Sequence, residues 1–400
     1  MTQQLLKALE PIWKQQGYQA MTPIQEELYQ PIKEGKNIVA TSPTGTGKTL
    51  AYLCPLLEEI QPQKGLQLLI IAPSQELVSQ LGDVVNLWAT PLNLKGQILL
   101  GGANFKRQVD ALKAKPEIII ATPGRLNELA EKSSKLKFHL VKTIVFDEAD
   151  YLMNPEHRQS MAKITKRLMR DVQKIWISAT LNDTLRQITQ KEGELIQPEQ
   201  THHDLAIKHQ YVLTPNRKKS DALRRLAHID GMKGMVFFDQ VHELEKTAAK
   251  LVHHGIPVAA LHSDLSKQER ELAMRLIHSG QVTFLLTTDV AARGLDIGDL
   301  PFIIHFNKPR TSDSYLHRSG RTGRSGKKGQ VISLVNEQEL KDLQDLLQPK
   351  GIALEAQALY EGQIEGADQV RRKKKNKTKH KHRKNKGKKR SKKQRKNKKG

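Results

Sequence analysis

Cysteine is almost absent from this sequence, since Cys54 is the only one in 400 residues. A single cysteine excludes an internal disulfide framework and a cysteine-based zinc site, and it is typical of a reducing compartment. No apolar run approaches the roughly 18 residues that are needed to span a bilayer. The first residues also lack the basic and apolar segments of a signal peptide. We therefore expect a soluble, cytoplasmic protein without a membrane partner.

Acidic and aromatic residues are both missing from the last 30 residues. Residues 371–400 contain 20 Lys or Arg and no Asp or Glu, whereas residues 1–370 contain 46 basic and 42 acidic residues. The formal net charge of +24 therefore belongs almost entirely to this basic tail. A segment of this composition cannot bury apolar surface, so we expect it to be disordered and to bind polyanions, nucleic acid above all.

Short apolar runs alternate with segments of helical length and amphipathic spacing along the rest of the chain. Ten runs have the continuous Ile, Leu and Val of strands covered on both faces. They lie at 37–41, 66–72, 117–121, 143–146, 174–177, 235–238, 258–261, 283–286, 302–306 and 330–335. This alternation predicts an α/β fold with parallel sheets, in two successive copies.

The expected organisation has four parts. We expect a first domain at residues 1–200, a linker at 201–209, a second domain at 210–360 and the disordered tail at 361–400. Polar, glycine-rich or charged clusters directly follow several of the expected strands. Because ligands bind at the carboxyl ends of strands in open parallel sheets, these clusters should share one edge of each sheet.

The first such cluster has the pattern of a phosphate-binding loop between a strand and a helix. Its residues are Ser42, Pro43, Thr44, Gly45, Thr46, Gly47, Lys48 and Thr49. Glycines let backbone N–H groups surround phosphates, the lysine places a positive charge on them, and the threonine hydroxyl reaches Mg²⁺. The alternative is a glycine-rich turn before a helix, with no ligand.

The second cluster is the acidic stretch Asp147–Asp150, which follows the run at 143–146. A carboxylate at a strand end opposite a phosphate loop can hold Mg²⁺ through its water shell, and a neighbouring one can activate the attacking water. Three acids together can equally be a solvated strand end. Their place about 100 residues after the phosphate loop favours the catalytic interpretation.

The second half contributes a run with three arginines and two glycines, His317–Arg324. Such a run is often ordinary surface. An arginine supplied by one domain to a γ-phosphate held by another would neutralise charge in the transition state, and would make hydrolysis depend on domain closure.

These motifs in this order resemble those of the DEAD-box ATP-dependent RNA helicases of superfamily 2, over roughly residues 10–360. The resemblance rests on 17–25, the phosphate loop, Asp147–Asp150, Ser178-Ala179-Thr180, 288–296 and His317–Arg324. It implies two tandem RecA-like domains that close over ATP, Mg²⁺ and single-stranded RNA.

The resemblance also assigns roles to individual residues. Catalysis would rest on Lys48, Asp147, Glu148, Arg321 and Arg324. Gln25 would read the adenine edge, Asp296 would meet the ribose, and Thr49 and Asp147 would hold Mg²⁺, partly through water. Coupling between nucleotide and closure would use Ser178, Thr180 and His317. RNA would be bound without base readout by Pro73, Glu76, Gly101, Gly102, Thr122, Pro123, Gly124, Arg125, Arg270, Thr288 and Gly294.

The chain departs from the usual family pattern at Gln75 and Lys267, where an arginine and a glutamine are common. We therefore expect retained ATPase activity with weak RNA affinity in the two domains. The leading hypothesis is an RNA-stimulated ATPase that separates short duplexes locally or remodels RNA–protein complexes, with structured and plausibly ribosomal RNA held by the tail. The alternative is an ATP-gated RNA clamp or assembly scaffold. A DNA helicase matches the motif set less well.

Overall fold

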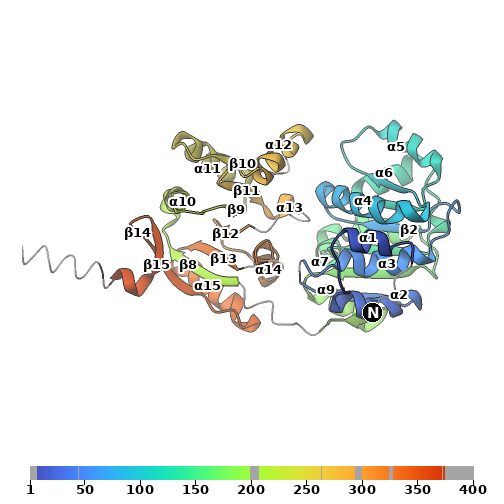
Figure 1. Cartoon of the computed structure of the whole chain (residues 1–400), viewed down its shortest axis with the longest axis horizontal. Coiled ribbons are helices and arrows are strands. Elements are labelled where there is room, and N and C mark those ends of the chain that lie inside the picture. The colour runs from blue at the N-terminus through green and yellow to red at the C-terminus, as the bar shows by residue number, and fades with distance from the viewer. Residues whose placement is uncertain are drawn as a thin grey trace, which may run out of the picture.

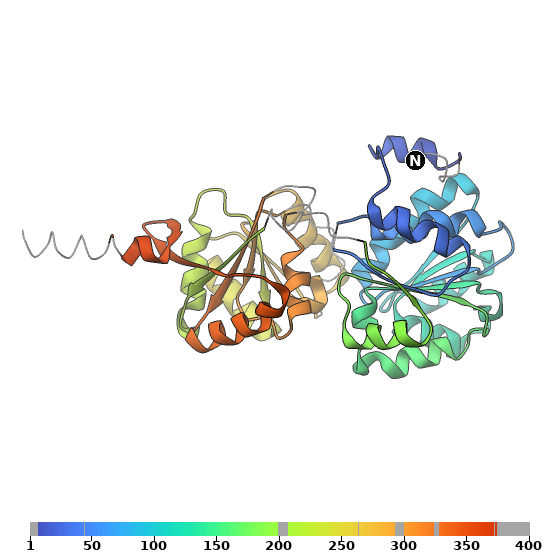
Figure 2. The same ribbon diagram turned by 90° about the horizontal axis from the view of Figure 1, so that it is seen from below.

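Two α/β domains follow one another in the computed structural model, and Figures 1 and 2 show them side by side. The structure describes residues 7–43, 45–198, 207–262, 264–292, 300–323, 328–371 and 373. Each domain is built on one sheet that has helices on both faces. The fold class predicted from the alternation of strands and helices is therefore confirmed.

The first sheet has seven strands, all paired in parallel. In spatial order they are β3 (Gly96–Leu99), β4 (Ile118–Ala121), β2 (Leu68–Ile71), β5 (Thr143–Asp147), β6 (Gln173–Ser178), β1 (Ile38–Thr41) and β7 (Glu194–Ile196). The order places β1 and β5 on either side of β6. The loops after these three strands therefore leave the same edge of the sheet.

Alternate residues of these strands pack into two separate cores. Ile38 and Ala40 belong to one cluster, whereas Val39 belongs to the other. The first core is covered by α1 (Glu10–Gln15), α2 (Pro23–Lys33), α3 (Lys48–Glu59) and α4 (Gln75–Ala89). The second is covered mainly by α6 (Pro123–Lys132), α8 (Arg158–Thr165) and α9 (Asp183–Lys191), with α5 (Phe105–Ala111) and α7 (Ala149–Leu152) beside them.

The second sheet has eight strands, parallel except at one end. Their order is β10 (Val258–Leu261), β11 (Phe284–Thr288), β9 (Gly234–Phe238), β12 (Phe302–His305), β13 (Gly329–Val335), β8 (Ile207–Leu213), β14 (Glu355–Tyr360) and β15 (Gln363–Gly366). One face packs on α12 (Lys267–His278), α14 (Ser312–Ser319) and α15 (Glu337–Leu347), and the other on α10 (Lys219–Ala227) and α11 (Val241–His253). The short helix α13 (Asp289–Ala292) follows β11.

The strands missed by sequence reasoning lie at or near the sheet edges. The edge strands β3 and β7 have mixed or exposed faces, and β8 carries Lys208, His209 and Gln210. Such strands lack the continuous apolar run of a central strand. Because β8 begins at Ile207, the second sheet starts inside the linker expected at 201–209.

The expected boundary at residue 360 is too early, because an ordered hairpin continues beyond it. Glu361 and Gly362 both have positive φ angles, of 48° and 78°, and they join β14 to the antiparallel β15. Two central residues with positive φ are typical of the type I′ hairpin turn. Val370 is also buried. The part of the chain that begins the basic tail therefore packs on the second domain.

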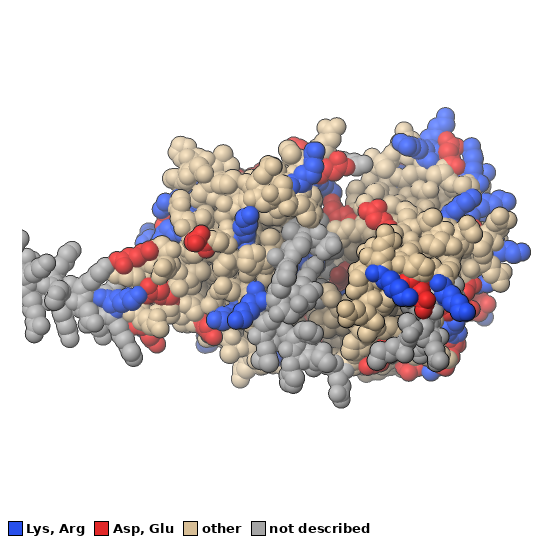
Figure 3. Space-filling model, viewed as in Figure 1, with Lys and Arg blue, Asp and Glu red and all other residues tan. Residues whose placement is uncertain are grey.

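No helix within the described residues is both long and apolar enough to cross a bilayer. Figure 3 shows basic and acidic side chains interspersed over the visible face of both domains. This mixture agrees with the nearly balanced charge of residues 1–370.

Candidate functional site

The phosphate-loop residues lie between the buried strand β1 and helix α3, as the sequence predicts. Gly47 immediately precedes α3 and has a φ of 84°, a conformation that favours glycine. A Cβ atom there would lie 2.5 Å from Gln25 Nε2. Gly47 is therefore required both by its backbone angle and by its close neighbour.

Lys48 is the first residue of α3, and its side chain turns back over its own loop. Its Nζ donates to the carbonyl oxygens of Ser42 and Pro43, at 2.7 and 3.2 Å. Burial lowers the pKa of Lys48, while the negative charges of Glu148 and Asp147 oppose that shift. The Lys48 ammonium thus lies within the electric field of the acidic stretch, and its contact with phosphate stays a prediction.

Gln25 connects the start of α2 to the phosphate loop. Its Oε1 accepts from the N–H of Thr22 at 2.8 Å, and its Nε2 donates to the carbonyl of Gly47 at 3.2 Å. The Thr22 hydroxyl also donates to the carbonyl of Thr46 at 2.8 Å. The adenine contact of Gln25 stays a prediction, but its amide is placed directly against the loop that precedes Lys48.

Asp147 ends β5 and has both carboxylate oxygens engaged. Oδ2 accepts from the Tyr52 hydroxyl at 2.9 Å, and Oδ1 accepts from the N–H of Glu148 at 3.0 Å. Burial, followed by the charge of Glu148, raises the pKa of Asp147 from 3.8 to about 6. A buried carboxylate with a raised pKa is poorly compensated by its surroundings, so a divalent cation beside it would be stabilised.

Tyr52 was not identified from the sequence. It is fully buried, and burial raises its pKa well above the usual value. Its position four residues after Lys48 in α3 was the available signal, because residues at this spacing share one face of a helix. Tyr52 fixes the orientation of the Asp147 carboxylate.

Glu148 has a φ of 54° and a ψ of 50°, in the left-handed region that non-glycine residues rarely adopt. Its side chain is buried, and its Oε2 has no hydrogen-bond partner in the described protein. Strained backbone angles of this kind are typical of active sites. This geometry aims a carboxylate with free accepting capacity into the site.

The residues after β6 hold the end of the acidic stretch. Thr180 Oγ1 lies 3.5 Å from Asp150 Oδ2, and the Thr180 N–H donates to Ser178 Oγ at 3.1 Å. Asn182, which sequence reasoning did not identify, donates from Nδ2 to the Asp150 carbonyl at 3.0 Å. Of the two predicted coupling residues of the first domain, Thr180 therefore contacts the acidic stretch itself, and Ser178 contacts Thr180.

His317 reaches the same acidic stretch from the second domain. Its Nε2 lies 2.9 Å from Asp150 Oδ2, and its Nδ1 lies 3.7 Å from Glu148 Oε2. The three side chains are buried and place possible ligand atoms within 4.8 Å of one another, so they could also hold a metal ion. Arg321 is buried as well, and its positive charge contributes to the lowered pKa of Lys48. Both domains thus supply residues to one site.

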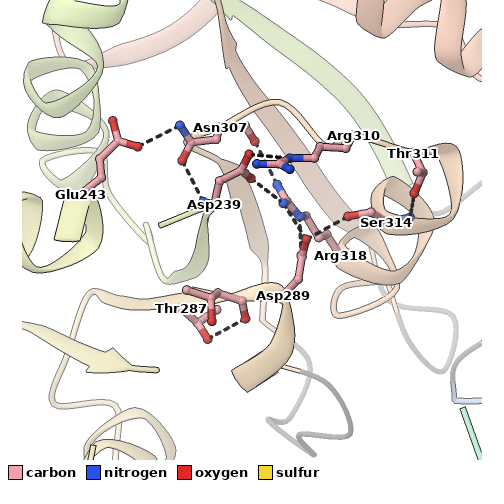
Figure 4. A network of polar contacts seen from close by, with 10 residues as sticks. Asp239, Glu243, Thr287, Asp289, Asn307, Arg310, Thr311, Ser314 and Arg318 are labelled. Atoms are coloured by element: carbon pink, nitrogen blue, oxygen red, sulfur yellow. Dashed lines mark hydrogen bonds and ion pairs between the residues drawn. The ribbon is translucent and has the colours of Figure 1, made fainter. Parts of the chain in front are cut away.

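Arg318 lies between His317 and Arg321 in the sequence, and it is the most important residue to which sequence reasoning gave no role. Its guanidinium is almost completely buried and forms a double ion pair with Asp289, at 2.6 and 2.8 Å. It also contacts Asp239 Oδ1 at 3.2 Å and donates to the Asn307 carbonyl at 2.9 Å (Figure 4). These contacts join the ends of β9, β11 and β12 to α14, and so position His317.

Comparison with known proteins agrees with this arrangement. A family model described as DEAD/DEAH box helicase matches residues 22–188, and another for the helicase conserved C-terminal domain matches residues 218–326. The probable ATP-dependent RNA helicase YfmL of Bacillus subtilis (strain 168) is 45% identical over 356 residues, which are 88% of this chain and 94% of that protein. The chain belongs to the DEAD-box ATP-dependent RNA helicase family.

Two further similarities extend over most of this helicase. The DEAD-box ATP-dependent RNA helicase CshC of Bacillus cereus is 39% identical over 372 residues, 92% of this chain and 95% of that protein. The solved structure of S. cerevisiae Dbp5 bound to RNA and ADP BeF3 has a TM-score of 0.80 at 26% identity, and covers 89% of this chain and 94% of that one. Tandem RecA-like domains are therefore the fold of this helicase.

The residues predicted to bind RNA lie mainly after strands β2, β3, β4 and β11. Thr122 and Pro123 begin α6, and Pro73 precedes α4. Arg270 Nη1 lies 2.6 Å from Glu76 Oε1, so two predicted RNA contacts pair with each other across the two domains of the helicase. Four predicted site residues, Thr44, Gly294, Asp296 and Arg324, lie outside the described residues.

Arg125 makes contacts within the first domain that the sequence did not predict, and its contact with RNA stays a prediction. Its side chain is buried, its Nε donates to the Leu100 carbonyl at 2.7 Å, and its other nitrogens contact the Ala103 carbonyl and Glu128. The guanidinium therefore holds the loop that carries Gly101 and Gly102. The Nε2 atom of Gln75 lies beside Gly101, 3.4 Å from where a Cβ would be. Gly102 in this loop is exposed, and Gly101 is half-buried.

Asp147→Asn should stabilise the first domain at neutral pH. Folding raises the pKa of Asp147 from 3.8 to about 6. Between about pH 4 and pH 6 the unfolded chain has therefore lost a proton that the folded protein keeps, and ionising Asp147 in the folded protein costs stability. This loss of stability reaches its full size above about pH 6. We expect the variant to gain about 1–3 kcal/mol in unfolding free energy at about pH 7.5 and to lose this advantage near pH 4–5. Denaturant unfolding at both pH values measures it, and an identical pH dependence in both proteins would contradict it.

Arg318→Lys should destabilise the second domain by about 1–3 kcal/mol, because a single buried ammonium cannot replace both the double ion pair with Asp289 and the hydrogen bond to the Asn307 carbonyl. Urea unfolding of the domain measures the loss. The matched control is Arg310→Lys, since Arg310 is 79% exposed and makes one contact of 3.3 Å with the same Asp239. Equal effects of the two changes would contradict the assigned role.

Proposed function

We propose that this helicase couples ATP binding and hydrolysis to local, non-processive separation of RNA duplexes or to remodelling of RNA–protein complexes. The observation that carries the proposal is the meeting of His317 and Arg321 of the second domain with Lys48, Glu148 and Asp150 of the first. Hydrolysis that needs groups from both domains would occur only while the domains are closed. Closure would thus connect the state of the nucleotide to the shape of the bound RNA.

Each side chain of the site would have a separate role in ATP hydrolysis, and its position supports that role. Lys48 and Arg321 would offset the charge that develops on the transferred phosphoryl group, and Glu148 would orient and deprotonate the attacking water. Thr49 and Asp147 would hold Mg²⁺, in part through water, and the ion would neutralise phosphate charge. The hydroxyl of Tyr52 and the N–H of Glu148 would keep the Asp147 carboxylate in a fixed orientation throughout.

RNA would cross the exposed strand-end loops of both domains. Gly102 and Gly124 are exposed and Gly101 is half-buried, so their backbone amides would contact phosphates, and contact of this kind does not read bases. We further propose that the basic tail holds large structured RNA, for example ribosomal RNA, near these loops. A cytoplasmic location and a role in ribosome assembly belong to the same proposal.

An ATP-gated RNA clamp is the second candidate, and the ion pair between Arg270 and Glu76 favours it because it links the domains outside the ATP site. The two functions differ in what each hydrolysed ATP achieves. A helicase should release a displaced strand for few ATP molecules. A clamp should instead hold RNA for long times in a nonhydrolysable ATP analogue and displace little strand.

Glu148→Gln should abolish RNA-stimulated ATP hydrolysis, lowering it by about 10²–10⁴-fold, because the amide cannot accept the proton of the attacking water. ATP turnover with and without structured RNA measures this. The variant should still bind RNA in the presence of ATP, which distinguishes lost chemistry from a lost fold. Hydrolysis at the wild-type rate would remove Glu148 from its proposed role.

Ending the chain after Lys373 should raise the RNA concentration needed for half-maximal ATPase stimulation and should flatten its salt dependence. The change removes 17 Lys or Arg but keeps the buried Val370 and the pairing of Lys373 with Glu365. Each lost phosphate contact should reduce the slope of log affinity against log salt by about 0.7–0.9. A shuffled tail of the same composition should behave like wild type, since the tail can bind RNA only through its charge. An unchanged slope in the truncated chain would contradict the proposal that the tail holds RNA.

A further inference from the structure

A cavity of about 620 Å³ lies in the second domain, away from the ATP site. It is bounded by the end of β8, by α10, by β14 and by the last described residues, 367–371. Figures 1 and 2 both place β14 and these last residues at the end of the second domain that is opposite the first domain. The volume falls within the range of about 300–1,000 Å³ that is common for small-ligand sites.

The cavity combines apolar walls with a cationic rim. Val212, Ala222 and Leu359 line it and belong to, or pack against, the core on the α10 face of the sheet. Lys218, Arg225 and Arg371 also line it, and all three are exposed. Apolar surface beside several cations is the combination that recognises a nucleotide, since one part accommodates the base and the other the phosphates.

The acidic residues of the cavity do not cancel this positive charge. Asp221 and Asp368 line it as well. However, Asp221 accepts two hydrogen bonds from the neighbouring Arg224, at 2.8 and 3.1 Å. Together with Arg224 the rim therefore carries four cations against two carboxylates.

The basic tail begins at the same rim. Val370 is only 3% exposed, and Lys373 Nζ lies 2.7 Å from both carboxylate oxygens of Glu365 in β15. These contacts fix the point from which the remaining 17 Lys and Arg of residues 374–400 depart. The cationic rim therefore lies close to the point where the sequence of the basic tail begins.

We propose that this cavity is a second RNA site, which takes an unpaired nucleotide while the flanking phosphates lie on the rim formed by Lys218, Arg225 and Arg371. The inference rests on the proposed RNA-dependent function. It adds a fixed attachment point, remote from the ATP site, to a tail that binds by charge alone. RNA anchored there stays bound to the second domain when the two domains separate.

The test uses the full-length protein and an RNA hairpin with a single-stranded loop. The double variant Lys218→Glu/Arg371→Glu should weaken binding about tenfold at ~100 mM salt, because two phosphate contacts become repulsive. Lys246→Glu/Lys250→Glu is the matched control, since both lysines are exposed on α11 and do not line the cavity. It should change affinity less than about twofold. RNA-free ATP hydrolysis should be unchanged in both.

A second variant tests the base-binding part without changing charge. Ala367 lines the cavity and is half-buried, so Ala367→Trp should fill it. This change should weaken binding of the looped hairpin but not of a blunt duplex of equal charge. Photo-crosslinking of hairpin RNA with 4-thiouridine in the loop should label residues near 211–225 or 356–371, and Ala367→Trp should remove that label.

Three results would overturn the inference. They are a loss in the α11 control equal to that in the rim variant, unchanged hairpin affinity in either cavity variant, and a crosslink that falls only outside residues 211–225 and 356–371. Each of these leaves the proposed function intact if RNA still stimulates wild-type ATPase. Failure of that stimulation in the wild-type protein would instead remove the proposed function itself.

Discussion

The buried negative charge at the end of β5 is the constraint on which the rest of the site depends. Asp147, Glu148 and Asp150 are all buried, and their own domain compensates them only in part. Lys48 and Tyr52 approach from α3, and Thr180 and Asn182 from the end of β6. From the second domain, His317 contacts Glu148 and Asp150, and the charge of Arg321 acts on Lys48. Polar contacts with this buried acidic stretch therefore connect the first domain to the second.

Much of the fold follows from the sequence because central strands of a parallel sheet are buried on both faces. The apolar runs that correspond to β1, β2, β4 and β5 are continuous. Each is followed by residues whose types indicate binding or catalysis. Edge strands follow weaker rules. Half-exposed strands such as β3 and β7 look like loops, and the hairpin of β14 and β15 was hidden by its closeness to the charged tail.

The site residues divide along a similar line. Lys48, Asp147 and His317 belong to short contiguous motifs, so they could be named from the sequence, His317 through the resemblance to the family. Tyr52, Asn182 and Arg318 act through partners far away in the chain, and only the fold brings those partners together. Arg125 illustrates the converse: an arginine in a strand-end loop suggested a contact with RNA, which stays a prediction, and the fold adds contacts with a neighbouring loop that the sequence did not predict. Residue type and position cannot distinguish these two uses of a guanidinium group.

The amide of Gln25 has a mechanical consequence. Its oxygen completes the cap of α2 while its nitrogen grips the carbonyl that immediately precedes α3. One planar group thus spans the starts of two helices, and neither contact can shift without straining the other. Any rearrangement of the phosphate loop would be transmitted as fraying or tightening of the first turn of α2. Glutamate could not replace Gln25, because a carboxylate has no donor for the Gly47 carbonyl. The uncharged amide thus connects the phosphate loop to α2 in the outer helix layer.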